Sequence, residues 1–399
     1  MTDKTFSGRH YETGAITNAL QAIGAIDPIT KMPYSEALAL GASGGIAFGH
    51  FVFEYTGHLP HVAILPRNTF APFARALDNL GIAREEKRTT NEAKAETDLI
   101  KELELGNAVL VWADMFSMPY RGLNAQMMWA MNPMLVVGTT QTGFLIVDGT
   151  HKPIEVSRED LGRARARVKK DRFQSMVLQK PDPDRVREGL IRGIKTCTEL
   201  FLDKPPAGSS DNFGIAGMKN WVKLLTDPKN PKGWTQKFEP GPRLVQALAG
   251  KHGQPGTWTW IEAWGTGDAA DRGTYAVFLR EASKWLSNSK LLTCADLFES
   301  SAPLWRELAN RCMPDSVVEF KSLKELRKMH ALLWLERGRE SDAERAEMRA
   351  EMSSLVDAVS EPGKLEGNAR DILEGMADTV SRIVSVEENA ANELRAAVE

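Results

Sequence analysis

The residues best suited to chemistry lie near the start of the chain, where a histidine and a glutamate flank a tyrosine: His10, Tyr11 and Glu12. An imidazole or a carboxylate can act as a general base. A phenol can act as a general acid or donate a hydrogen bond to an oxygen on which negative charge develops. Small and apolar residues then recur at helical spacing from 13 to 23. The triplet is therefore expected to sit where a helix begins.

A second polar group follows at a spacing of four residues: His50, Glu54 and His58. On a helix these side chains would share one face, and with His10 they could bind iron or zinc. A glycine and a proline interrupt such a helix, and residues 51–55 look like a strand, in which evenly spaced residues also share a face. Two interpretations stay open: a metal site, or polar residues around the mouth of a cleft. We favour the second and expect no bound metal.

Two aspartates end apolar segments that are predicted to be strands. Asp148 ends the segment 143–148, where a carboxylate commonly orients a base on a neighbouring strand, although Asp-Gly is also a turn dipeptide. Asp114 follows the strand 108–112 and could either bind a substrate amine or cap the next loop. No histidine lies at the start of the neighbouring strand, around Asn132.

The elements that must position these residues fall into two parts. Residues 1–178 mix helices with short strands and predict an α+β domain with a small antiparallel sheet. Two prolines then break the chain at 180–183. Residues 184–399 show helical periodicity almost throughout and predict a helical domain. The last stretch, 341–399, could form a helical hairpin that packs on this domain or mediates a homodimer.

Bulk properties exclude several classes of function. The net charge is −3, so no strong field for nucleic acid or a membrane surface is expected. No segment approaches the roughly 18 apolar residues of a membrane span. The three cysteines share no metal-ligand spacing, and a reduced, cytoplasmic protein is expected. Phosphate-loop and dinucleotide motifs are absent from the sequence, and no cofactor is expected.

The order of these motifs resembles the family of butirosin-biosynthesis protein H. The resemblance covers nearly the whole chain, and it rests on the following stretches: residues 8–13, 35–37 and 44–48, Asp114 with 118–120, 136–138, 147–148, 213–218, 272–281, 305–309 and 387–394.

The resemblance implies a papain-like N-terminal domain followed by a helical domain of unclassified function. It also implies acyl transfer from a carrier-protein thioester to the amine of a small-molecule acceptor. In that chemistry a cysteine takes the acyl group, a histidine moves protons and an aspartate orients the histidine. His10 and Asp148 match this pattern. Tyr11 stands where the family has its cysteine, and Asn132 stands about where it has its histidine.

These two substitutions bear directly on mechanism. The pKa of a tyrosine is about 10 against about 8.5 for a cysteine, and an asparagine cannot take up a proton. We therefore expect an enzyme of noncovalent mechanism, which transfers, condenses or cyclises an acyl group. Its catalytic residues would be Tyr11, His10, Asp148 and Asn132, and its substrate would contact Glu12, His50, Asp114 and Tyr120. The alternatives are a binding or scaffold protein for an acyl chain or carrier protein, and a metal-dependent enzyme built on His10, His50, Glu54 and His58.

Overall fold

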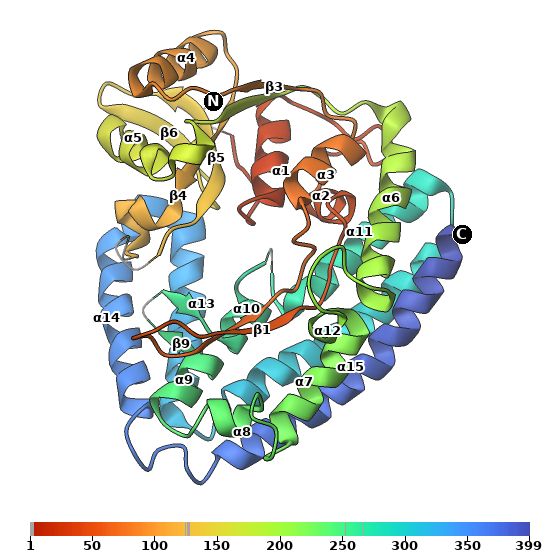
Figure 1. The fold of residues 1–399 in the computed structure, drawn as a ribbon. Helices are drawn as coiled ribbons and strands as arrows, with labels where there is room; N and C mark the ends of the chain where they lie inside the picture. Colours follow the sequence, from red (N-terminus) through yellow and green to blue (C-terminus); the bar gives the residue numbers. More distant parts are fainter. Residues whose placement is uncertain (1–3, 124, 126–127, 252, 266) are drawn as a thin grey trace. The chain divides into compact units, whose positions relative to one another are not determined.

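The computed structural model describes residues 4–399 apart from 124, 126–127, 252 and 266 (Figure 1). The chain divides into two compact units, and each is assembled from three stretches of sequence. The first unit contains 1–39, 76–186 and 328–348, and the second contains 40–75, 187–327 and 349–399. Each point at which the chain passes from one unit to the other lies inside a helix. No linker sequence therefore indicates the boundary between the units.

The first unit is built on one six-stranded sheet in which every neighbouring pair is antiparallel. The strand order is β3-β8-β4-β5-β6-β7. Its strands are β3 (Arg84–Lys87), β4 (Val109–Asp114), β5 (Met131–Thr139), β6 (Gly143–Val147), β7 (Ile154–Ser157) and β8 (Ser175–Leu178). Its helices include α1 (Thr13–Ala22), α4 (Glu92–Glu104) and α5 (Arg158–Ala166), with the short turns η1 (Met115–Ser117), η2 (Pro119–Arg121), η3 (Lys169–Asp171) and η6 (Gly338–Ser341).

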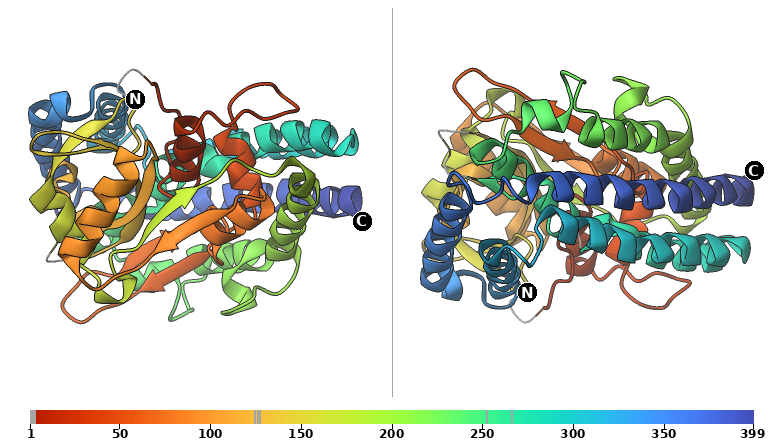
Figure 2. Two further views of the ribbon diagram at one scale, coloured as in Figure 1. Left: turned by 90° about the horizontal axis from the view of Figure 1, so that it is seen from above. Right: turned by 90° about the horizontal axis from the view of Figure 1, so that it is seen from below.

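The two faces of this sheet are covered by different helices (Figures 1 and 2). Val111 of β4, Val136 of β5 and Ile146 of β6 share a buried cluster with Leu99 of α4 and Leu161 of α5. Helix α1 packs against β4 and β5 from the other side. Because successive side chains of a strand point to opposite faces, residues two apart in one strand face the same side of the sheet.

The strands β4, β5, β6 and β7 appear where their sequences predict them, whereas β3 and the short apolar strand β8 were not predicted. Strand β3 has the sequence Arg-Glu-Glu-Lys and lies at the sheet edge with exposed side chains. Charged residues are usual on edge strands, where they discourage pairing with another chain. The apolar strand signal is therefore missing from β3, whereas its one neighbour, β8, is apolar.

The chain enters α1 through a tight backbone contact. A Cβ on Gly8 would lie 2.2 Å from the carbonyl oxygen of Gly14, so a larger residue does not fit. The Asn18 side chain closes the same turn: its Oδ1 accepts from the Gly8 amide at 2.8 Å, and its Nδ2 donates to the Gly8 carbonyl at 3.1 Å. These contacts fix the residues that lead into His10 and Tyr11.

The second unit is mainly helical, and α7, α11, α12 and α15 pack together in it. Sequence periodicity predicts two helices at 290–300 and 303–311, but the structure has one helix that continues through Pro303. The remaining helices of the chain, some of which cross between units, are as follows: α2 (Glu36–Ala42), α3 (Pro72–Asn79), α6 (Pro183–Leu202), α7 (Gly214–Thr226), α8 (Trp234–Lys237), α9 (Pro242–Leu248), α10 (Thr257–Glu262), α11 (Arg272–Leu286), α12 (Lys290–Cys312), α13 (Val318–Arg337), α14 (Asp342–Val359) and α15 (Ala369–Val398), with η4 (Ser210–Asn212) and η5 (Ala269–Asp271).

Two small hairpins complete the second unit. Strand β1 (His50–Phe53) pairs antiparallel with β2 (His61–Ile64), and β9 (Gly250–Lys251) pairs with β10 (Gln254–Pro255). The strand interpretation of residues 51–55 is thus confirmed for β1. His50, Glu54 and His58 do not lie on a helix, so their spacing of four residues does not place them on one helical face. The α+β class, with a small sheet towards the N-terminus and a helical C-terminal part, is also confirmed.

Across the described part of the chain, none of the helices combines the length and the apolar character that a bilayer crossing requires.

Candidate functional site

The turn before α1 is held by one carboxylate from the start of α2. Glu36 accepts hydrogen bonds from the backbone amides of Arg9 at 2.8 Å and His10 at 3.0 Å, and from the Thr13 hydroxyl at 2.8 Å. A carboxylate is well placed there because the first amides of a helix carry partial positive charge. Glu36 therefore fixes the backbone around His10 and Tyr11. The sequence had pointed to it only as one residue of the stretch 35–37 that resembles the family.

The His10 ring is buried, and its contacts define which nitrogen carries the proton. Its Nδ1 accepts a hydrogen bond from the Glu12 backbone amide at 3.2 Å. A neutral imidazole that accepts at Nδ1 has its proton on Nε2. The ring also lies 4.0 Å from the Tyr11 ring, centroid to centroid, at an angle of 33°. In its neutral form His10 is thus a hydrogen-bond donor at Nε2, which suits a group that stabilises an oxyanion better than it suits a base.

Asp148 follows β6 and is held by three side chains of the first unit. The Tyr120 hydroxyl donates to its Oδ2 at 2.8 Å, and Arg121 pairs with both carboxylate oxygens, at 3.0 Å from Nε to Oδ2 and 2.5 Å from Nη2 to Oδ1. The Trp334 indole donates to its backbone carbonyl at 2.9 Å. Burial raises the pKa of Tyr120 well above its usual value, and the negative charge of Asp148 acts in the same direction. Tyr120 therefore remains a protonated donor to Asp148.

The other side of this group is a stack of aromatic and cationic side chains. The rings of Tyr120 and Trp334 are nearly parallel, 5.0 Å apart at 9°. The Arg345 guanidinium lies 4.4 Å from the Trp334 ring, and its Nη2 donates to the Tyr120 carbonyl at 3.3 Å. Cation–π contacts of this kind gain strength when the cation is buried, as Arg345 is. The stack fixes Tyr120, and through it Asp148.

The residues after Asp148 lie against the residues that precede His10. A Cβ on Gly149 would be 3.4 Å from the carbonyl oxygen of Arg9. Two residues further, the His151 carbonyl accepts from the Phe6 amide at 2.9 Å, and His151 Nδ1 lies 3.0 Å from the Phe6 carbonyl oxygen. The structure thus brings the entry to α1 and the end of β6 side by side. That Tyr11 and Asp148 act in one papain-like site stays a prediction.

Asn132 lies elsewhere on the sheet. It pairs across strands with Ala113, which belongs to the cluster beneath α4 and α5. Its side-chain amide lies 3.2 Å from the Met115 sulfur. Asn132 therefore lies on the face of the sheet opposite α1. A catalytic role for Asn132 stays a prediction without a supporting contact.

Asp114 is wholly buried and organises the loop after β4. Its Oδ1 accepts from the amides of Phe116 at 3.2 Å and Ala130 at 2.8 Å, and its Oδ2 accepts from the Ser117 hydroxyl at 2.6 Å. These are the contacts of a capping residue. The alternative role, binding a substrate amine, stays a prediction.

The second histidine group lies in the other unit, on the β1–β2 hairpin. His50 is buried, its Nε2 accepts from the Trp234 indole at 3.4 Å, and burial lowers its pKa to about 3. Glu54 is exposed and forms an ion pair with Lys237 at 2.9 Å, and His58 is exposed on the following turn. Within the described residues no three His, Cys, Asp or Glu side chains are grouped to hold a metal ion. A metal site at this cluster is thus not supported.

The three cysteines are poor nucleophiles in this fold. Cys197, Cys294 and Cys312 are all buried. Burial raises the pKa of Cys197 to about 12 and that of Cys294 to about 11 and also raises the pKa of Cys312. Because the thiolate is the reactive form, none of the three is suited to act as a nucleophile.

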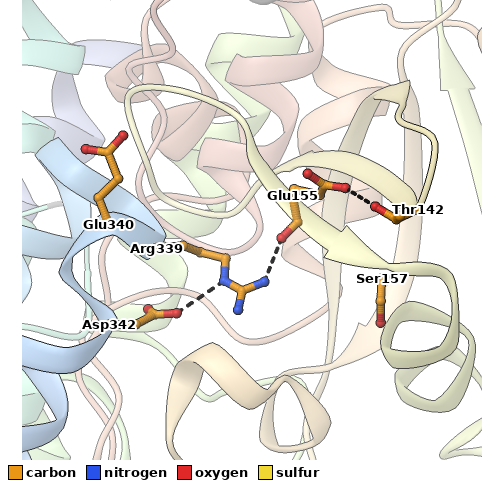
Figure 3. Close-up of a pocket in the computed structure, with 6 residues that line it drawn as sticks. All are labelled: Thr142, Glu155, Ser157, Arg339, Glu340 and Asp342. Carbon is orange, nitrogen blue, oxygen red and sulfur yellow. Dashed lines mark hydrogen bonds and ion pairs between the residues drawn. The ribbon is translucent and has the colours of Figure 1, made fainter.

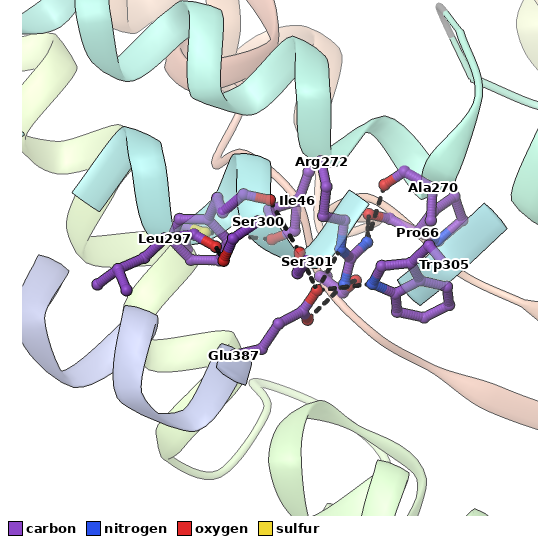
Figure 4. Close-up of polar contacts among 12 residues, drawn as sticks. Ile46, Pro66, Ala270, Arg272, Leu297, Ser300, Ser301, Trp305 and Glu387 are labelled. Atoms are coloured by element: carbon purple, nitrogen blue, oxygen red, sulfur yellow. Dashed lines mark hydrogen bonds and ion pairs between the residues drawn. The ribbon is translucent and has the colours of Figure 1, made fainter. Parts of the chain in front are cut away.

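A buried ion pair organises the second unit (Figure 4). Arg272 of α11 donates to both carboxylate oxygens of Glu387 of α15, at 2.8 and 2.9 Å. Its remaining N–H groups point to three backbone carbonyls, those of Pro66, Ala270 and Ala47, at 2.8–3.3 Å. Both charged side chains are fully buried. All five donors of the guanidinium are therefore used, which is the condition under which a buried charge is tolerated.

An open depression of about 590 Å³ lies in the first unit (Figure 3). Arg339 crosses it, donating from Nε to Asp342 at 3.2 Å and from Nη1 to the Glu155 backbone at 3.0 Å. None of the residues predicted to be catalytic lines it. The lining residues are Thr142, Glu155, Ser157, Arg339, Glu340 and Asp342.

Two family models match the chain. The model described as butirosin biosynthesis protein H, N-terminal, matches residues 10–149, and a domain of unknown function, DUF4872, matches residues 159–346. The chain belongs to the butirosin biosynthesis protein H-like family. A comparison with curated proteins finds no match.

The matched ranges relate directly to the geometry. The butirosin-type model begins at His10 and ends at Gly149, and these ends are the two segments that meet beside Arg9. Trp334 and Arg345, which hold Asp148 and Tyr120, fall near the end of the DUF4872 match. Sequence reasoning missed both, because no local pattern links them to residues about two hundred positions earlier.

Proposed function

We propose that this chain transfers an acyl group from a thioester to an amine without forming an acyl-enzyme. The observation that carries the proposal is that residues 6–9, which lead into His10 and Tyr11, lie against residues 149–151, within a family whose N-terminal model is that of a biosynthesis protein. The donor would be an acyl group on a carrier protein, and the acceptor a small molecule with an amine. A cytoplasmic location fits such partners.

The reaction needs few groups from the protein. The acceptor nitrogen attacks the thioester carbonyl carbon, the carbon–sulfur bond breaks, and the leaving thiolate takes up the proton that the amine loses. The products are an amide and a free thiol. Donors aimed at the oxygen that becomes negatively charged are commonly the largest catalytic contribution.

The contacts suggest a role for each residue of the site. The hydroxyl of Tyr11 and Nε2–H of His10 would donate to the oxyanion, and Glu12 would receive the amine proton and pass it to the leaving thiolate. Asp148, already bonded to Arg121 and Tyr120, would fix the loop beside the turn rather than move a proton. Asn132 is given no step, since its contact lies with Met115.

A binding or scaffold role is the second candidate. It is favoured by the absence of a reactive thiol, since all three cysteines are buried with raised pKa values. Such a protein would hold the acyl chain or carrier protein and leave the chemistry to another enzyme.

Amide formation from an aminoacyl-N-acetylcysteamine thioester and a primary amine separates the two candidates. We expect Tyr11→Phe to slow the reaction by roughly a hundredfold, the usual cost of losing one oxyanion donor, and His10→Gln to slow it as well. The matched controls are Tyr55→Phe and His58→Gln, which alter exposed side chains of the same types in the other unit. Equal rates for the Tyr11 and Tyr55 variants would refute the mechanism. Tight thioester binding with no amide would support the scaffold role.

A further inference from the structure

The segment 328–348, from the late part of the DUF4872 match, belongs to the same compact unit as the butirosin-type N-terminal domain. Besides its contacts with Tyr120, it makes three hydrogen bonds with the backbone of one stretch, residues 148–155. Trp334 donates to the Asp148 carbonyl at 2.9 Å, the Leu335 carbonyl accepts from the His151 amide at 2.9 Å, and Arg339 donates to the Glu155 carbonyl at 3.0 Å. The helix end and the turn after it thus hold the backbone of this stretch at three points.

The held stretch is also the one that touches the entry to α1. His151 exchanges contacts with Phe6 through its carbonyl and its Nδ1, and Gly149 abuts the Arg9 carbonyl. A continuous set of contacts therefore runs from Trp334 through 148–151 to residues 6–9, which lead into His10 and Tyr11. The Arg345–Trp334–Tyr120 stack braces the same set from the Asp148 side chain.

We propose that Trp334 and Arg345 are positioning residues of the acyl-transfer site, which gives the end of the domain of unknown function a role: it completes the N-terminal domain. The proposal rests on the proposed function for what His10 and Tyr11 do. The positioning of His10 and Tyr11 by Trp334 and Arg345 can be measured without any turnover of substrate. It implies that the butirosin-type domain is incomplete without residues 328–348.

The test compares two tryptophans of the full-length chain. Trp334→Phe keeps a ring to stack on Tyr120 but removes the donor to Asp148. Trp260→Phe is the matched control, because the Trp260 indole also donates to a backbone carbonyl, that of Val62, at 3.0 Å, within the second unit. Each change removes one indole donor and replaces two fused rings by one; because Trp334 is buried and Trp260 only partly buried, the comparison rests on where exchange rises and not on the overall loss of stability.

The readout is amide hydrogen exchange of residues 6–12 and 148–151. Losing one hydrogen bond raises local opening by roughly tenfold, so we expect exchange to rise about tenfold there in Trp334→Phe and to stay unchanged in Trp260→Phe. Exchange in these segments that is equal in the two variants would overturn the inference. If Trp334→Phe does not fold, Arg345→Met, which removes the cation and its bond to Tyr120, decides in the same way.

A second readout connects the positioning to chemistry. With the aminoacyl-N-acetylcysteamine thioester, Trp334→Phe should lower kcat with little change in KM, because the misplaced groups act after binding. A rise in KM alone would contradict positioning. A wild-type chain without turnover would refute the proposed function, while the exchange result would still decide the inference.

Discussion

Replacing Glu387 by alanine should destabilise the second unit far more than replacing its neighbour Glu388. Glu387 is fully buried, and its carboxylate accepts from Arg272, from the Trp305 indole at 2.6 Å and from the Ser301 hydroxyl at 3.0 Å. Glu388 forms an ion pair with Lys219 at the surface, where both side chains are about half exposed. The two substitutions delete the same side chain from adjacent positions of α15.

The magnitude follows from what is left behind. Glu387→Ala strands the buried Arg272 charge, and removal of one partner of a buried pair costs roughly 3–5 kcal/mol. Loss of an exposed pair costs about 0–1 kcal/mol. The variants should therefore differ by at least about 2 kcal/mol in the free energy of unfolding.

Urea unfolding followed by tryptophan fluorescence measures this difference. A gap below about 1 kcal/mol would show that Arg272 does not depend on Glu387. The double variant Arg272→Met with Glu387→Leu removes both charges, and we expect it to recover much of the loss, since apolar residues commonly replace a buried pair at little cost. A double variant as unstable as Glu387→Ala would contradict this.

Three further predictions concern single groups. Burial lowers the pKa of His50 to about 3, below its value of about 6.5 in the unfolded chain, so its contribution to stability is complete above pH 6.5 and is lost as the pH falls towards 3. In the wild-type chain the free energy of unfolding should fall by about 1 kcal/mol per pH unit as the pH is lowered through that window. The fall should be less steep in His50→Phe and as steep as in the wild type in His58→Gln. The ¹⁵N resonances of His10 should show an unprotonated Nδ1 at high pH; a protonated Nδ1 would contradict its bond from Glu12. Tyr120→Phe keeps the stack on Trp334 but loses the hydrogen bond to a carboxylate, and thermal unfolding should show a loss of roughly 1.5–3 kcal/mol; an unchanged Tm would refute the bond.

Four charged residues in the stretches that carry the family resemblance share a structural property. Asp114, Asp148, Arg272 and Glu387 are buried charged groups whose hydrogen bonds are made within their own unit. A buried charge is costly unless its partners are in place, so each such residue needs several others.

The sequence predicted the elements whose signal is local. The apolar runs of β4, β5 and β6 and the start of α1 could be read from residue spacing, and so could the position of Asp148 at the end of a strand. The charged strand β3 gave no apolar signal. The proline in α12 indicated a break that packing overrides.

The candidate site was predictable only in its N-terminal part. The partners of Asp148 and Tyr120 in the later segment lie 186 and 225 residues away in sequence, and one chain holds no local pattern that joins them. The assembly of the first unit from three stretches could not be predicted either. The chain passes from one unit to the other within helices, where no break in the sequence pattern marks the boundary. Long-range contacts, rather than motifs, define this site.

The central claim is that the chain transfers an acyl group without carrying it. Intact-protein mass spectrometry during a single turnover with the aminoacyl-N-acetylcysteamine thioester and a primary amine tests this most directly. We expect the amide to accumulate while the protein keeps its unmodified mass at every time point. A protein heavier by one acyl group, forming and decaying at the rate at which the amide appears, would contradict it.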